Sequence, residues 1–167
     1  MPGLRLMPEL APLPGGYLDS CRVCRNLAGL ERFSPGPWIY EGKYWRVDHA
    51  YPVKVLGWLV VVLKRHTSFL HELTEAEFAE LGWIQAHGTR LLHEILHNER
   101  EYMASFSEQQ RYQHINVHIL AVPADLPPEA LGSLFFGWHE TLEQPIVSPG
   151  MVTTLAWRLR DGFETAS

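Results

Sequence analysis

Residues 114–120, with the sequence HINVHIL, constrain the fold more than any other stretch of the chain. Three polar residues alternate there with three apolar ones. Successive side chains of a β-strand point to opposite faces of a sheet, so the alternation predicts a strand with one polar and one apolar face. His114, Asn116 and His118 would form a row on the polar face. Two members of this row are histidines, and the central one is an asparagine.

The rest of the chain predicts an α+β domain with a mostly antiparallel sheet. Residues 57–64, GWLVVVLK, are nearly all apolar and rich in β-branched side chains, as is typical of a central buried strand. The other strands are predicted at residues 37–40, 44–49, 101–106 and 112–122, the first two as a hairpin around Glu41-Gly42. Helices are predicted at residues 21–29, 73–99 and 149–161, and a loop with a short helix at 124–132.

The stretch 73–99 is the clearest helix in the sequence. Thr74 and Glu77 have the spacing of a capping box, in which each side chain binds the backbone of the other residue. An apolar stripe with helical spacing follows, and its members are Phe78, Leu81, Ile84, Gly88, Leu91, Leu92 and Ile95. This stripe is the expected contact of the helix with the core.

Composition limits the classes of function. The chain has 167 residues, of which 46% are hydrophobic, and suits one globular domain at residues 19–167 after a Pro-rich arm at 1–18. The net charge of -5 and the absence of a Lys/Arg block argue against nucleic acid or an anionic membrane as main partner. No apolar run reaches the length of a membrane span, and the N-terminus lacks the core of a signal peptide. We therefore expect a cytoplasmic protein with reduced cysteines.

Cys21-x-x-Cys24 is half of a tetrahedral zinc site, which needs two more ligands. A redox pair and two incidental cysteines are the alternatives. Among nine histidines, His66 closes the buried strand and His114 opens the polar row, but spacing alone identifies neither as a ligand. His93 and His97, four residues apart, suit the solvent face of the long helix.

Taken in order, these stretches resemble the histidine triad (HIT) superfamily, whose motif alternates three histidines with apolar residues. The matching pieces are CRVC at 21–24, the stretch 44–77 with its Lys-x-His at 64–66, HINVHIL, and ADLPPEALGSLFF at 124–136. The resemblance covers residues 20 to 137. It implies a HIT-like antiparallel five-stranded sheet with a long helix packed on it, and a homodimer.

The resemblance also implies a structural zinc ion. In zinc-bearing members of the family, the two cysteines are joined by the histidine of Lys-x-His and the first triad histidine. Carried over to this chain, the ligands are Cys21, Cys24, His66 and His114. Four protein ligands leave no open position, which is typical of a structural site. Such a site contributes up to ~10 kcal/mol of apparent binding free energy to the folded state.

In the family, the second triad histidine attacks the α-phosphorus of a nucleotide, and the third helps to bind the phosphate. Asn116 stands at the position of the nucleophile, and His118 at that of the third histidine. An amide nitrogen is a poor nucleophile because its lone pair is delocalised, so we expect little or no covalent nucleotidyl transfer. Asp48 matches an aspartate that contacts ribose hydroxyls, although a turn-capping role before Pro52 is an equal alternative.

Two further polar residues, Ser107 and Gln110, are weaker candidates to line a nucleotide site. The residues after the motif, Ala121-Val122, depart from the Pro-Arg that is frequent in the family.

Four hypotheses remain open at this point. The first is a zinc-bearing protein with a degenerate triad that binds a purine nucleotide or dinucleotide. The second is an active hydrolase of dinucleoside polyphosphates or nucleoside phosphoramidates that uses His118 or a released His114. The third is a zinc-stabilised dimeric scaffold without a ligand. The fourth is an ordinary hydrolase with an inactivating change at position 116.

Overall fold

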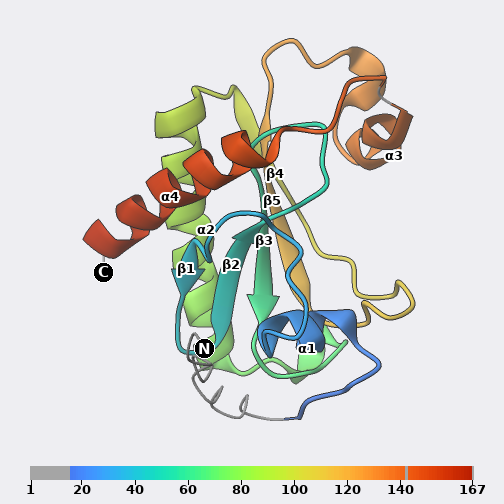
Figure 1. Cartoon of the computed structure of the whole chain (residues 1–167), viewed down its shortest axis with the longest axis vertical. Coiled ribbons are helices and arrows are strands. Elements are labelled where there is room, and N and C mark those ends of the chain that lie inside the picture. Colours follow the sequence, from blue (N-terminus) through green and yellow to red (C-terminus); the bar gives the residue numbers. More distant parts are fainter. Residues whose placement is uncertain (1–15, 142, 167) are drawn as a thin grey trace, which may run out of the picture.

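A five-stranded antiparallel sheet forms the centre of the computed structural model, which describes residues 16–141 and 143–166. The strand order is β1-β2-β3-β5-β4 (Figure 1). The strands are β1 (Tyr40–Glu41), β2 (Trp45–His49), β3 (Trp58–Leu63), β4 (Arg100–Ala104) and β5 (Asn116–Val122). The predicted α+β class, the hairpin and the central position of residues 57–64 are confirmed.

Strand β5 begins later than its sequence predicts. The alternation suggested a strand from residue 112, whereas the structure begins it at Asn116. Ile115 still donates its backbone N–H to the carbonyl oxygen of Thr67 and accepts from Leu63, so pairing with the segment after β3 extends slightly beyond the strand. Residues 112–114 are not part of the strand, so His114 precedes it.

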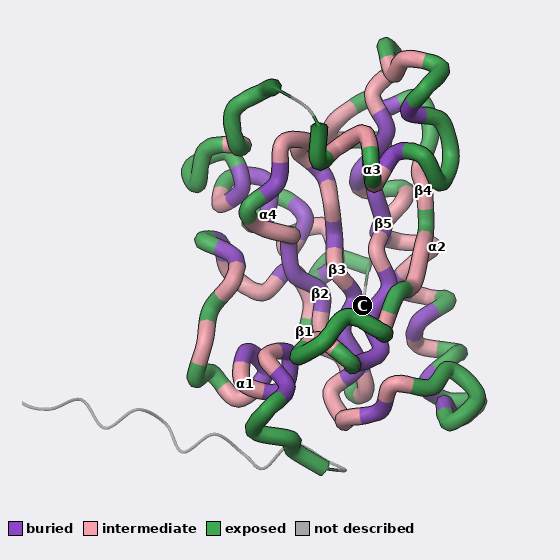
Figure 2. The backbone as a smooth tube through the Cα atoms, turned by 90° about the vertical axis from the view of Figure 1, so that its right-hand side faces the viewer, coloured by how far each residue is buried: buried purple, intermediate pink, exposed green. Residues whose placement is uncertain are grey.

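The main core lies on one face of the sheet, under two helices. Alternate strand residues point into it, among them Val47, Val61, Val117 and Ile119. Helices α2 (Glu75–Leu96) and α4 (Pro149–Thr165) supply the other side of this core. The central strands are mostly buried, whereas the edge strand β4 is only partly covered (Figure 2).

Helix α2 has the predicted capping box: Thr74 Oγ1 accepts from the backbone of Glu77, and the Glu77 carboxylate accepts from the backbone of Thr74. The helix ends at Leu96, three residues before the predicted end, because His97 adopts a left-handed conformation with φ of 54°. Of the predicted apolar stripe, Phe78 is exposed, which corrects its assignment to the core.

The opposite face of the sheet carries two short helices at its two ends (Figure 1). Helix α1 (Arg22–Leu27) packs on Val62 in a small second cluster of buried apolar residues. Helix α3 (Leu134–Thr141) packs on Trp58 through Phe135 and His139. The sequence predicted α1 but not α3. Two short 3-10 helices, η1 (Leu70–Glu72) and η2 (Pro128–Ala130), complete the described elements.

Most of the predicted Pro-rich arm, residues 1–15, lies outside the described residues. Within the part of the chain that the structure describes, no helix combines the length and the apolar character needed to cross a membrane.

Candidate functional site

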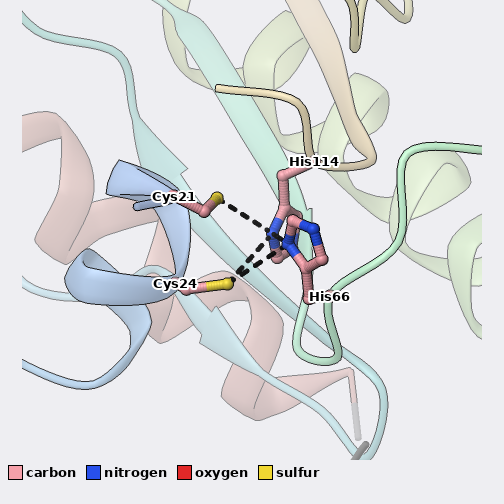
Figure 3. A group of neighbouring side chains, drawn as sticks. All are labelled: Cys21, Cys24, His66 and His114. Carbon is pink, nitrogen blue, oxygen red and sulfur yellow. Dashed lines mark hydrogen bonds between the residues drawn. The ribbon is translucent and has the colours of Figure 1, made fainter. Parts of the chain in front are cut away.

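Four side chains from three separate segments converge at one end of the sheet. Figure 3 shows Cys21 and Cys24 at helix α1, facing His66 from the segment after β3 and His114 from the segment before β5. One ligand atom from each of the four lies within 4.8 Å of the others. Three of these residues are buried, and His66 is half-buried. The structure thus brings together the four predicted zinc ligands.

Four of the distances between ligand atoms match those around a tetrahedral zinc ion. His114 Nδ1 lies 3.6 Å from both sulfur atoms and 3.3 Å from His66 Nδ1, and Cys24 Sγ lies 3.4 Å from His66 Nδ1. Zn–S bonds of about 2.3 Å and Zn–N bonds of about 2.0–2.1 Å place tetrahedral ligands about 3.3–3.8 Å apart. Two thiolates and two imidazoles at this spacing fit Zn²⁺, with no position left for substrate.

Neighbouring groups prepare the ligands for a cation. His114 Nε2 donates to the carbonyl oxygen of Leu63 at 2.6 Å, which fixes the proton on Nε2 and leaves the Nδ1 lone pair facing the cysteines. The two cysteines are unpaired. A hydrogen bond from Cys24 lowers the pKa of Cys21, and the same contact together with burial raises the pKa of Cys24. The apoprotein therefore holds one thiolate readily, and a metal ion would displace the remaining proton.

Backbone contacts bring helix α1 to this end of the sheet. Cys21 is the residue before the first turn, and its N–H donates to the carbonyl oxygen of Leu18. The N–H of Arg22 donates to the carbonyl oxygen of Arg111, and its guanidinium donates to the Tyr112 hydroxyl. The segment that precedes His114 is thereby joined to the helix that carries the cysteines.

Asn116 is buried beside this cluster and its amide is occupied. Nδ2 donates to the backbone carbonyl oxygens of His114 at 2.9 Å and Phe106 at 3.2 Å. Oδ1 has no hydrogen-bond partner among the described residues. Both N–H groups are thus used to hold the β4–β5 connection, and an oxygen acceptor remains.

His118 lies two residues along the same face, within an aromatic cluster. Its Nδ1 accepts from Trp58 Nε1 at 3.0 Å, so the neutral ring carries its proton on Nε2. The rings of Phe106 and Phe136 each lie 6.3 Å from the imidazole. Burial lowers the pKa of His118 to about 4. His118 is therefore a neutral donor at pH 7.

Asp48 is aligned with His118 across the sheet, because both pair with Val60 on β3. Its carboxylate forms an ion pair with Arg32, which sequence reasoning missed. Nothing local signals this pair, since the two residues are separated by 16 positions. Burial raises the pKa of Asp48, and the Arg32 guanidinium opposes this shift.

For the two weaker candidates, Ser107 and Gln110, a role beside this row stays a prediction. Ser107 donates to the backbone carbonyl oxygen of Ser68, and Gln110 is exposed in a turn. Across residues 16–141 and 143–166, no hydrogen bond joins either side chain to Asn116 or His118.

Comparisons with known proteins place the fold. No protein-family model matches the chain, and no curated protein matches it. A Hit-like protein involved in cell-cycle regulation from Bartonella henselae has a similar structure, with a TM-score of 0.66, 12% identity, and coverage of 87% of this chain and 98% of that one. A hypothetical histidine triad nucleotide-binding protein from Sulfolobus tokodaii has a TM-score of 0.64 and 17% identity, and the match covers 87% and 93% of the two chains.

A Zn-bound histidine triad family protein from Mycobacterium smegmatis is also similar, with a TM-score of 0.62 and 17% identity over 89% of this chain and 98% of that one. At such identities the likeness concerns the fold. The described domain has the fold of the histidine triad proteins, with a Cys2His2 cluster suited to zinc.

Proposed function

We propose that this protein is a zinc-stabilised, histidine triad type nucleotide-binding protein with little or no covalent nucleotidyl-transfer activity. Its ligand would be a purine nucleotide or dinucleotide bound along the row from Asp48 to His118. Unpaired thiols that serve as zinc ligands favour a reducing compartment, so we propose that it acts in the cytoplasm.

The state of Asn116 is the observation that carries this proposal. An amide nitrogen is not nucleophilic, and here both of its N–H groups already donate to backbone carbonyl oxygens. Loss of a covalent nucleophile can reduce a rate by on the order of 10⁶, as in a serine protease. A protein that keeps the fold and the ligand row but has this side chain at position 116 is suited to binding rather than to transfer.

An active hydrolase would need another histidine as nucleophile. His114 has Nδ1 among the four metal-ligand atoms and Nε2 engaged with Leu63. His118 has Nδ1 engaged by Trp58, and its Nε2 carries the proton. Neither ring offers a free lone pair in this arrangement, which favours the binding function.

The test combines metal analysis with a gain of function. Purified protein is expected to contain one zinc ion per chain and to bind AMP or a dinucleoside polyphosphate without turning it over. Asn116→His is expected to gain hydrolysis of dinucleoside polyphosphates or nucleoside phosphoramidates, whereas Asn116→Gln, which keeps an amide, is not. Rapid turnover by the unmodified protein, or a nucleotide trapped on His114 or His118, would contradict the proposal. Failure of any nucleotide to bind at millimolar concentration would favour a scaffold.

A further inference from the structure

The carboxylate of Asp48 is covered by a guanidinium. Arg32 Nη1 donates to Oδ2, Arg32 Nη2 donates to Oδ1 at 3.0 Å, and the backbone N–H of His49 also donates to Oδ1 at 3.0 Å. The Asp48 side chain is 9% exposed, whereas that of Arg32 is 36% exposed. The Asp48 carboxylate therefore lies beneath the Arg32 guanidinium, and a ligand that approaches this end of the face meets Arg32 first.

Hydrogen-bond capacity defines what this pair can recognise. A carboxylate has about four lone-pair sites, and three of those of Asp48 are filled. It cannot accept from both hydroxyls of a ribose. A guanidinium has five N–H donors, and Arg32 uses three, the third reaching the carbonyl oxygen of Gly36. Among the described residues, its Nε–H and one Nη1–H have no acceptor.

Two contacts hold the guanidinium in place. Its plane is fixed by the paired bonds to Asp48, and its carbon lies 4.5 Å from the centre of the Trp38 ring. A stacked and paired arginine loses little conformational freedom when it binds an anion, and its planar donors suit phosphate. A free Asp48 carboxylate at this end of the face would accept from sugar hydroxyls. Because Arg32 covers it, this end presents the fixed N–H donors of the guanidinium instead.

We propose that Arg32 forms a subsite for an anionic group, and that the ligand is a nucleotide with a phosphate on its ribose 2′- or 3′-hydroxyl. This inference rests on the proposed nucleotide-binding function. The underlying chemistry is general, since acidic residues in dinucleotide-binding folds read a ribose hydroxyl and a nearby arginine accommodates a 2′-phosphate. Asp48 and His118 share Val60 as their neighbour, so the sugar phosphate would lie at Arg32 and the 5′ end towards His118.

Calorimetric titration of the zinc-loaded protein tests the preference. Adenosine 2′,5′-bisphosphate or 3′,5′-bisphosphate is expected to bind about tenfold or more tightly than 5′-AMP, as one added charge-assisted contact allows. Arg32→Gln should abolish the preference, and the matched control is Arg90→Gln, the same change at an exposed site on α2. Arg32→Gln alone leaves the buried Asp48 carboxylate without its partner and can prevent folding. The double variant Arg32→Gln/Asp48→Asn removes that charge, and it should also lose the preference for the bisphosphates.

Inorganic phosphate supplies a readout that does not depend on a nucleotide. It is expected to shift the indole N–H signal of Trp38 in NMR spectra of the native protein and of Arg90→Gln, but not of the double variant, with chloride at equal ionic strength as the blank. If 5′-AMP binds as tightly as the bisphosphates, the subsite is wrong and nucleotide binding stands. If phosphate shifts Trp38 but no nucleotide binds, the anion subsite stands and the proposed function fails. If substitution of Arg32 changes neither the phosphate-induced shift of Trp38 nor the binding of the bisphosphates, the inference is overturned.

Discussion

Asn116 has a structural role in this protein besides its place in the polar row of His114, Asn116 and His118. Its two side-chain N–H groups donate to the carbonyl oxygens of Phe106 and His114. The backbone carbonyl oxygen of Asn116 accepts from the Ser105 hydroxyl. An aspartate of the same shape would replace both donors by a carboxylate that faces two carbonyl oxygens. A buried charge without donors is costly, as is a lost pair of hydrogen bonds.

We therefore expect Asn116→Asp to lower the free energy of unfolding by about 3 kcal/mol or more at pH 7. Urea titration followed by tryptophan fluorescence measures this change. Gln110→Glu makes the same substitution of amide by acid at an exposed position and should change the free energy by less than about 0.5 kcal/mol. Equal effects of the two substitutions would show that the amide of Asn116 holds nothing.

His118 gives the protein a predictable response to acid. Its pKa is lowered from 6.5 to about 4 by burial, so the folded protein keeps it neutral at pH values where the unfolded chain already binds a proton. The unfolded state thus binds more protons between pH 6.5 and 4, and stability falls as the pH falls through this range. The contribution lost is about 2–3 kcal/mol.

The measurement is the free energy of unfolding at pH 7, 5.5 and 4 for the native protein and His118→Gln. The stability difference between them is expected to shift by about 2–3 kcal/mol in favour of the variant as the pH falls. Contributions that the two proteins share cancel in this difference. His71→Gln, at an exposed position, should leave the pH dependence unchanged. If the unfolding free energies of the native protein and His118→Gln depend on pH in parallel, burial does not lower the pKa of His118 as proposed.

We expect helix α1 to depend on metal binding for its stability. It has six residues, too few for stability in isolation, and its apolar contacts are limited to a small cluster around Leu27 and Val62. Zinc would connect it to the segments after β3 and before β5. Removing zinc should therefore release α1 and residues 111–115 while the larger core under α2 stays folded.

Hydrogen exchange with and without a chelator tests this dependence. Backbone amides of residues 22–28 and 111–115 should lose protection, those of α2 should keep it, and the unfolding free energy should fall by several kcal/mol. Cys24→Ser should show the same loss of protection without a chelator and no further response to one. The prediction is wrong if the protein purifies without zinc and its hydrogen-exchange protection does not change with chelator.

Over the whole molecule, the sequence predicted what local patterns encode. Polar–apolar alternation predicted β5, a β-branched apolar run predicted β3, and the Thr74–Glu77 spacing predicted the start of α2. The metal cluster was predicted from four pieces of sequence that resemble a known family in the same order. The Arg32–Asp48 pair and the aromatic cluster around His118 arise where distant segments meet, so no local pattern marked them. Helix α3 was missed for the same reason: Phe135 is buried by tertiary contacts with Trp58 and Tyr102.

The resemblance to the HIT superfamily also predicts the oligomeric state, a homodimer. Strand β4 is an edge of the sheet, and its residue Met103 is 48% exposed. Unpaired backbone groups beside an exposed apolar side chain favour association, and a lysine on such an edge opposes it. Light scattering should therefore give about twice the chain mass of 19.1 kDa for the native protein, and Met103→Lys should lower the measured mass towards that of a single chain. Phe78→Lys, a matched change at an exposed site on α2, should leave the dimer intact. A native protein that remains monomeric at tens of micromolar would refute the dimer, and a dimer insensitive to Met103→Lys would exclude the β4 edge as its interface.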